Sequence, residues 1–132
     1  MSTYNEVSIS IEDQECLVKA LQEMGYKPQV HQEAKALYGY QGDARKQKAH
    51  IILPRSQVGP ASNDIGFEKV NGKYILRISE YDISAKKFNT NLCKQLYATH
   101  RIKKAIKSNS KYKLKEETKE KGKIRVRIQL SN

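Results

Sequence analysis

Apolar and polar positions follow two different rhythms along the chain, and each rhythm predicts one type of element. Over residues 84–109, apolar side chains recur every three or four positions, as they do along one side of a helix. Ser84 is a suitable cap for the start of this helix, and Asn109 can adopt the left-handed conformation at its end. The predicted apolar stripe consists of Phe88, Leu92, Leu96, Thr99, Ile102 and Ile106.

A second, shorter helix is predicted near the N-terminus. Asp13 can cap its start, and Gly25 stands where a helix commonly ends with a residue of positive φ. Pro28 prevents the helix from continuing because it restricts the residue before it. The apolar stripe of this helix is formed by Leu17, Ala20, Leu21 and Met24.

Alternating residues and short apolar runs, which are typical of strands, occupy much of the remaining chain. Asn71-Gly72 separates two such runs, and this pair is the strongest short-range signal for a β-hairpin. Lys121-Gly122 marks a turn between the last two runs. Strands are predicted over residues 7–11, 34–40, 49–53, 64–70, 74–78, 112–116 and 124–130.

The order of these elements predicts the fold class. A strand, a helix, several hairpin-connected strands, a second helix and two final strands indicate an α+β fold, with a mostly antiparallel sheet and two helices packed on one face. The 132 residues suit a single domain, residues 1–132, with a basic C-terminal part from about residue 86. Residues 55–63 are predicted to be an exposed, mobile loop because they combine Gly and Pro with small polar residues.

The positive charge of the chain is unevenly distributed. The net charge is +11, and residues 1–85 carry 10 Lys and Arg against 11 Asp and Glu, whereas residues 86–132 carry 15 against 3. Such asymmetry indicates an anionic partner. The alternative is a bias of base composition, because an AT-rich genome favours lysine codons and Lys outnumbers Arg 19 to 6.

One face of the long predicted helix, together with the last strand, carries the candidate binding residues. Tyr97 stands among cationic side chains there, so its ring could stack on a base while the cations hold phosphates. The competing interpretation is a solvated helix face with Tyr97 packed sideways. The candidate residues for a protein or nucleic-acid partner are Lys94, Tyr97, Arg101, Lys104, Lys107, Arg125 and Arg127.

No constellation of residues predicts a nucleophile, a metal site or a cofactor site. His31, His50 and His100 lie in different predicted elements and lack the spacing of zinc ligands. Cys16 and Cys93 are too few and too far apart for a disulfide framework. Buried or half-buried thiols are therefore expected.

An enzyme is the least favoured class of protein. Asp64, Glu80 and Asp82 are the acids nearest the predicted hairpin, and paired carboxylates can act as acid and base. For Asp64, a hydrogen bond accepted from its own backbone is favoured, because Asp commonly takes this role in turns. A pocket near residues 39–40 and 64–67 remains the enzymatic hypothesis.

Four short segments stand in a fixed order within the chain: LYGYQG at residues 37–42, DIGF at 64–67, YIL at 74–76 and QLYA at 95–98. With them, the chain resembles the hypothetical chloroplast reading frame thirty-five family, small proteins of algal plastid genomes and cyanobacteria with relatives in other bacteria and phages. The resemblance covers nearly the whole chain, from the first strand to Leu130. It implies a one-domain layout and a compartment, and it implies no catalytic residues.

Two classes of function are therefore expected. The favoured one is a non-enzymatic accessory or adaptor protein that docks through the basic C-terminal part on an acidic protein partner or assembly. The alternative is an RNA- or DNA-binding protein that uses the 84–109 helix and the last hairpin. No segment has the roughly 20 apolar residues of a membrane span, and residues 1–11 lack the features of a signal peptide. An intracellular soluble protein is expected, in the plastid stroma if plastid-encoded and otherwise in the bacterial cytoplasm.

Overall fold

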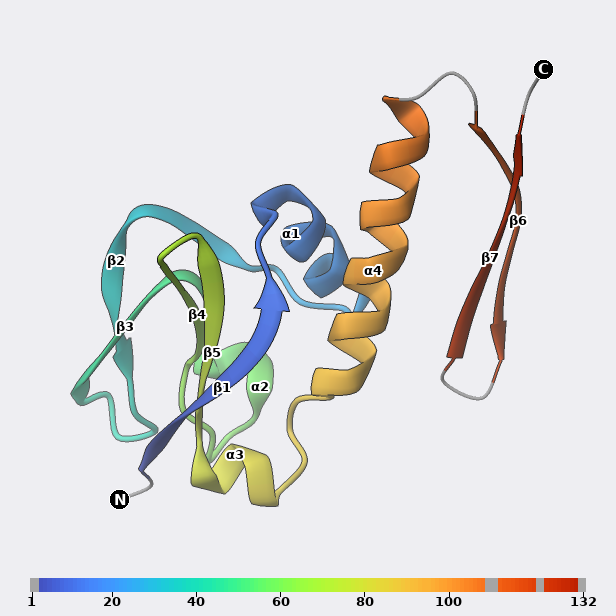
Figure 1. Cartoon of the computed structure of the whole chain (residues 1–132). Coiled ribbons are helices and arrows are strands. Elements are labelled where there is room, and N and C mark those ends of the chain that lie inside the picture. The colour runs from blue at the N-terminus through green and yellow to red at the C-terminus, as the bar shows by residue number, and fades with distance from the viewer. Residues whose placement is uncertain (1–2, 109–111, 121–122, 131–132) are drawn as a thin grey trace. The chain divides into compact units, whose positions relative to one another are not determined.

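The computed structural model describes residues 3–108, 112–120 and 123–130, the last two ranges by their backbone alone. The chain forms two compact units. Unit 1 comprises Met1–Glu12 and Gly25–Asn89, and unit 2 comprises Asp13–Met24 and Thr90–Asn132. In chain order the elements are β1 (Tyr4–Ile11), α1 (Gln14–Glu23), β2 (Gln29–Tyr38), β3 (Ala44–Leu53), α2 (Arg55–Val58), β4 (Ile65–Val70), β5 (Lys73–Ser79), α3 (Glu80–Ser84), α4 (Thr90–Lys107), β6 (Tyr112–Glu120) and β7 (Lys123–Leu130) (Figure 1).

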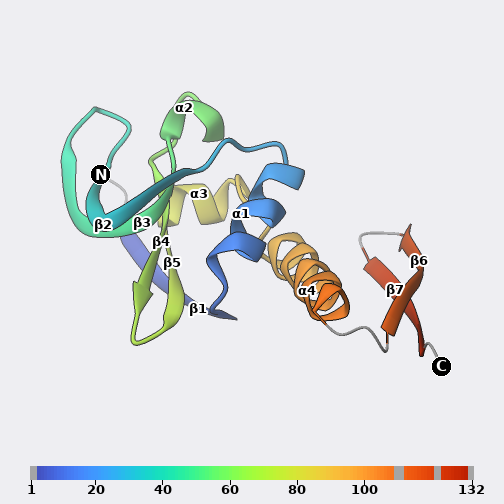
Figure 2. The same ribbon diagram turned by 90° about the horizontal axis from the view of Figure 1, so that it is seen from above.

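Unit 1 is built on a five-stranded antiparallel sheet with the strand order β1-β5-β4-β3-β2. Together with the helices, this sheet makes an α+β fold and confirms the predicted class. The described residues form four helices where two were predicted, because the short helices α2 and α3 carry no long apolar stripe. Figure 2 shows that the β2–β3 and β4–β5 hairpins leave the sheet in different directions.

The β4–β5 hairpin forms where the Asn-Gly pair predicted it. Val70 pairs with Lys73, so Asn71 and Gly72 are the two turn residues. Both have a positive φ, 52° for Asn71 and 82° for Gly72, as a type I′ turn requires. The twist of such a turn matches the twist of the two strands, so the local sequence determines the register of this pair.

The long helix begins later than predicted. The apolar stripe placed one helix over residues 84–109, but α3 ends at Ser84 and α4 begins at Thr90. Ser84 is therefore the last residue of a helix rather than the cap of one, which corrects the prediction. The predicted cap at Asn109 lies outside the described residues.

Local interactions in unit 1 explain this break in the helix. The Ser79 hydroxyl accepts a hydrogen bond from the Asp82 N–H at 3.1 Å and donates one to the Asp82 carboxylate at 2.7 Å, which starts α3. Lys86 then adopts a φ of 54°, a left-handed conformation typical of helix ends. Phe88 packs against Tyr26 and Phe67 at ring-centroid distances of 5.9 and 6.0 Å. Phe88, the first residue of the predicted apolar stripe, therefore belongs to unit 1 and not to α4.

Residues 55–63 are partly helical and partly buried, so the prediction of an exposed loop holds for only part of the segment. Arg55–Val58 form α2, and Asn63 is buried. The Asn63 side chain accepts a hydrogen bond from the Tyr40 N–H at 3.0 Å and donates one to the Ser79 hydroxyl at 2.9 Å. Composition could not indicate this burial, because both partners are distant in the sequence.

Gly66 of β4 lies where neighbouring side chains leave no room for a Cβ. A Cβ at this position would stand 2.5 Å from the Ala49 Cβ and 2.7 Å from the Leu37 Cδ2. Leu37 and Ala49 belong to a buried cluster that also contains Tyr4 and Ile52. The glycine therefore lets this cluster pack closely against the middle of the sheet.

Gly66→Ala is expected to destabilise the protein. The added methyl group must displace two buried side chains, and overpacking of this kind costs about 1–3 kcal/mol. A lower urea midpoint would measure the loss. Val70→Ala, at an exposed position of the same strand, is the control and should change the free energy of unfolding by about 0.5 kcal/mol or less. An unchanged midpoint for Gly66→Ala would show that the cluster accommodates the methyl group.

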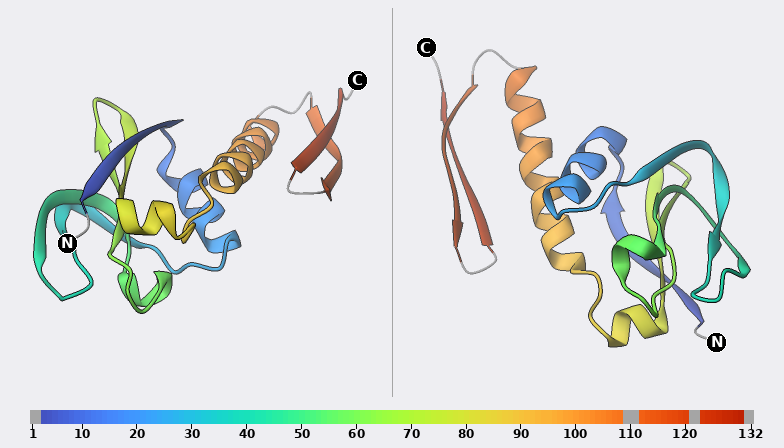
Figure 3. Two further views of the ribbon diagram at one scale, coloured as in Figure 1. Left: turned by 90° about the horizontal axis from the view of Figure 1, so that it is seen from below. Right: turned by 180° about the vertical axis from the view of Figure 1, so that it is seen from behind.

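Unit 2 contains α1, α4 and the β6–β7 hairpin. Asp13 caps α1 as predicted, because its Oδ1 accepts a hydrogen bond from the Cys16 N–H at 2.9 Å. Gly25 follows α1 with the predicted positive φ, 98°. Helices α1 and α4 lie side by side (Figure 3). Their buried residues are Cys16, Leu17, Ala20 and Leu21 in α1 and Cys93, Leu96 and Thr99 in α4.

The last two predicted strands form an antiparallel hairpin of β6 and β7. Arg125 pairs with Thr118 and Arg127 pairs with Glu116, so the two arginines take alternate positions of β7. Their side chains, and the predicted turn at residues 121–122, lie outside the described part of the chain.

Candidate functional site

The candidate binding residues Lys94, Tyr97, Arg101, Lys104 and Lys107 all lie on α4. Asp13, the cap of α1, contacts three of them. Its N–H donates to the Tyr97 hydroxyl at 3.0 Å, and its Oδ2 accepts from Arg101 Nη1 at 3.1 Å and from Lys104 Nζ at 2.7 Å. A single capping residue therefore contacts the tyrosine hydroxyl and two of the cations that the sequence assigns to a partner.

These contacts keep Asp13 ionised. The hydrogen bond from Lys104, together with those from the backbone and the side chain of Cys16, outweighs partial burial and holds the pKa of the Asp13 carboxyl well below its ordinary value. The same contact raises the pKa of Lys104. At neutral pH both groups are therefore charged, and their attraction favours the folded state.

Acid is expected to remove the contribution of Asp13 to stability. A lowered folded-state pKa means that the stabilisation is present above the unfolded value of about 3.9 and is lost as the pH falls towards the folded value. Asp13→Asn retains a good helix cap but loses both ion pairs. The gap in free energy of unfolding between the wild type and this variant should therefore shrink between about pH 5 and pH 2. A gap that stays constant in urea titrations across this range would contradict the assignment.

A groove of about 410 Å³ lies between α1 and α4, beside these contacts. We call it the α1–α4 groove; its described lining includes Glu15, Lys19, Lys103, Lys104, Ile106 and Lys107. Four lysines stand there against one glutamate, so the groove is positively charged, and Ile106 adds apolar surface. Such a lining suits an anionic partner that also has an apolar group.

The cysteines and the histidine of unit 2 offer no activated nucleophile. Cys16 and Cys93 are buried free thiols, as predicted. Burial raises the pKa of the Cys93 thiol to about 12 and also raises the pKa of Cys16, so both stay protonated at neutral pH. His100 Nε2 lies 3.4 Å from the Glu23 carboxylate rather than beside a thiol. Among the described residues, no group of His, Cys, Asp and Glu is arranged to hold a metal ion.

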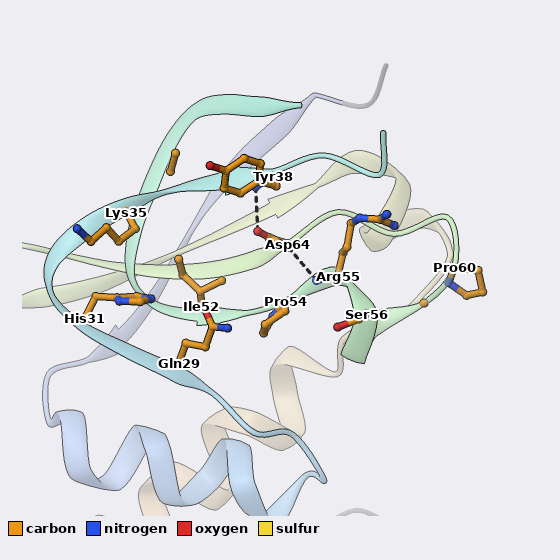
Figure 4. Close-up of a pocket in the computed structure, with 12 residues that line it drawn as sticks. Gln29, His31, Lys35, Tyr38, Ile52, Pro54, Arg55, Ser56, Pro60 and Asp64 are labelled. Carbon is orange, nitrogen blue, oxygen red and sulfur yellow. Dashed lines mark hydrogen bonds between the residues drawn. The ribbon is translucent and has the colours of Figure 1, made fainter. Parts of the chain in front are cut away.

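Asp64 joins three segments of unit 1. Its Oδ2 accepts a hydrogen bond from the Tyr38 N–H at 2.9 Å, and its Oδ1 accepts one from the Arg55 N–H at 2.8 Å (Figure 4). Its carbonyl accepts one from the Tyr4 hydroxyl at 2.6 Å. Burial raises the pKa of Tyr4, so this hydroxyl stays protonated and donates. The predicted bond of Asp64 to its own backbone is therefore wrong, because its partners belong to distant segments.

Asp82 is also a structural carboxylate. It is fully buried, and its Oδ2 accepts hydrogen bonds from the Ser79 hydroxyl at 2.7 Å and from the Asn63 N–H at 3.1 Å. Glu80, by contrast, is exposed. Asp64 and Asp82 therefore hold backbone segments of unit 1 in place.

Three of the four segments that carry the family resemblance meet in unit 1, and the fourth, residues 95–98, lies on α4 of unit 2. Tyr38 of the 37–42 segment is joined to Asp64 of the 64–67 segment by two hydrogen bonds, because the Asp64 N–H also donates to the Tyr38 carbonyl at 2.9 Å. Phe67 at the end of the second segment pairs with Leu76 of the 74–76 segment. These three short segments therefore contact one another within unit 1.

Comparison with protein families identifies the family of this chain. The profile of the family described as "Protein of unknown function (DUF1257)" matches residues 20–127. The chain is a member of DUF1257. The match covers most of both units of this DUF1257 protein, including the five-stranded sheet from β2 onwards and the whole of α4. Comparisons with curated proteins and with solved structures give no match.

Sequence reasoning missed several residues of the basic region in this DUF1257 chain. The sequence gives Asp13 a capping role alone and does not indicate that Lys19 belongs to the site. The packing of α1 on α4 brings them to the candidate residues, and no local pattern contains this packing.

None of the helices in the described ranges is long and apolar enough to cross a membrane.

Proposed function

We propose that the protein is a non-enzymatic accessory or adaptor protein that docks on an acidic protein partner or assembly through the basic surface of unit 2. The observation that carries this proposal is the α1–α4 groove, in which four lysines and an isoleucine stand against one glutamate. An acidic helix or loop could place carboxylates against the lysines and an apolar side chain against Ile106. The proposal needs no cofactor.

The contacts of Tyr97 favour a protein partner over a nucleic acid. Base stacking needs an accessible ring, and Tyr97 is half-buried with its hydroxyl fixed by the Asp13 N–H. RNA or DNA binding through α4 and the β6–β7 hairpin is the alternative, and the positive charge of residues 86–132 supports it.

Titration with labelled RNA and DNA separates the two functions. If the protein docks on a protein partner, we expect it to bind RNA and DNA only weakly, through diffuse positive charge, with an affinity that falls steeply as salt rises. Tyr97→Ala should leave this weak binding unchanged. Binding that loses about 1–3 kcal/mol in Tyr97→Ala would instead reveal a stacked base and favour the alternative. Tyr81→Ala, which truncates an exposed tyrosine of α3 outside the basic surface, is the matched control and should leave the binding unchanged.

We further propose that this DUF1257 protein belongs to the hypothetical chloroplast reading frame thirty-five group within the family. The hydrogen-bonded meeting of the 37–42 and 64–67 segments supports this, because both segments carry the resemblance. Its compartment would then be the plastid stroma, or the cytoplasm if a bacterium encodes it. Localisation of a tagged copy in the source cells tests this assignment.

A further inference from the structure

Strand β1 forms one edge of the five-stranded sheet of unit 1, and its outer side has no partner strand. In the described part of the chain, β5 is the only strand that pairs with β1 (Figure 1). This pairing runs without a shift from Tyr4, opposite Ser79, to Ser8, opposite Ile75. An edge strand presents unpaired N–H and C=O groups that can pair with another chain. We call the outer side of residues 4–8 the β1 edge.

Alternate residues of β1 direct their backbone groups to the β1 edge. In an antiparallel pair, directly opposite residues alternate between hydrogen-bonded and non-hydrogen-bonded pairs. The Glu80 N–H donates to the Thr3 carbonyl at 2.8 Å, so the odd-numbered residues from Thr3 to Val7 are bonded towards β5. The N–H and C=O of Glu6 and Ser8 therefore face outward.

The β1 edge lacks the features that usually keep an edge strand from pairing with another chain. Lysine, proline and bulges are common protections, and residues 4–8 contain neither lysine nor proline. The bulge of β1 begins only after Ser8. Glu6 is the one charged residue of the segment, and its carboxylate is already paired with Arg77 of β5. Its charge is therefore balanced within unit 1.

The opposite edge of the sheet, formed by β2, is protected. The register of β2 against β3 shifts between Val30 and Lys35 and again between Ala36 and Tyr38. Glu33 and Lys35 add exposed charges to the same strand. Bulges and charges of this kind oppose pairing with another chain. The sheet can therefore be extended from β1 and not from β2, so an assembly through the β1 edge closes at two copies.

The sequence of β1 is complementary to itself in one antiparallel register. Outward-facing residues must pair with outward-facing residues, so the registers that use most of the edge are centred on Glu6 or on Val7. A register centred on Glu6 places two glutamates directly opposite each other, which is destabilising. A register centred on Val7 places Glu6 opposite Ser8 at two symmetric positions. It also brings the two Val7 side chains together as a β-branched pair.

From these observations we infer that the β1 edge binds a second copy of this chain, with the two β1 strands antiparallel and centred on Val7. The backbones of Glu6 and Ser8 exchange hydrogen bonds across the interface, and a two-fold axis makes each contact twice. Val7 is half-buried in the single chain, and the second copy covers more of it. The two sheets become one continuous sheet. This interface is independent of the docking surface proposed for unit 2.

Sedimentation equilibrium of the full chain and of two charge variants tests the inference. The wild type should dimerise, with a mass that rises with concentration. Ser8→Glu places a glutamate opposite Glu6 at both contacts and should raise the dissociation constant of the dimer about tenfold or more. Ser8→Lys places a lysine there instead and should retain or strengthen the dimer. The two variants are matched, because both add one charge at the same exposed position.

Val7→Cys tests the register independently. The two Val7 residues would form a non-hydrogen-bonded pair with Cα atoms about 4.5 Å apart, a separation that a disulfide can span. Oxidised glutathione should therefore link two copies of Val7→Cys but not of Lys48→Cys, an exposed control on β3, and the native thiols are buried.

A wild type that stays monomeric at millimolar concentration would overturn the inference. So would a dimer that Ser8→Glu and Ser8→Lys weaken equally, or a disulfide that forms as readily in Lys48→Cys as in Val7→Cys.

Discussion

Asp64→Asn is expected to lower the free energy of unfolding by about 3 kcal/mol, because hydrogen bonds to a charged group contribute about 1.5–3 kcal/mol each and a buried donor is left without a partner. The Asp64 carboxylate accepts from two backbone N–H groups, and the residue is 7% exposed. An asparagine offers one oxygen, and its amide would direct an N–H against the remaining N–H. Urea denaturation measures the loss.

Glu33→Gln is the control for Asp64→Asn, since it removes one carboxylate charge from an exposed position of β2. It should change stability by about 0.5 kcal/mol or less. Equal effects of the two substitutions would contradict the role of Asp64 in joining β2 and α2.

Leu96→Ala is expected to destabilise the protein by about 2–5 kcal/mol, the usual cost of truncating a buried leucine. Leu96 is 4% exposed on α4, next to the buried positions of α1. The lost methyl groups remove apolar burial and leave a cavity, and helices packed on each other close such a cavity only in part. The shift of the urea midpoint is again the measurement.

Ile102→Ala provides a sharp comparison on the same helix. The sequence placed Leu96 and Ile102 in one apolar stripe, but Ile102 is 37% exposed. Its truncation should therefore cost clearly less than that of Leu96. A larger loss of stability for Ile102→Ala than for Leu96→Ala would place Ile102 on the buried side of α4 and contradict its exposure.

Signals that act within a few residues were sufficient to predict much of the fold. The Asn71-Gly72 hairpin, the Asp13 cap and the Gly25 helix end need only neighbouring residues, and all three are confirmed. The buried thiols followed from the usual behaviour of cysteine. The α+β class followed from the order of such elements.

Features that depend on distant residues could not be predicted. Phe88 continues the helical spacing of the stripe, yet it packs on Tyr26 and Phe67, and no periodicity distinguishes these outcomes. Asn63 is polar and follows Gly and Pro, but its partners bury it. The candidate site is similar, because the sequence shows the basic residues of α4 and does not show that Asp13 shares two of them.

Affinity capture from native cell extract after nuclease treatment tests the proposed docking function most directly. The wild type is compared with Lys103→Glu/Lys107→Glu in the α1–α4 groove and with Lys46→Glu/Lys48→Glu in β3, which makes the same change of charge. The proposal predicts a defined set of proteins that survives nuclease, is retained by the β3 variant and is lost by the groove variant. Loss of every partner on nuclease treatment, or equal loss from both variants, would contradict it.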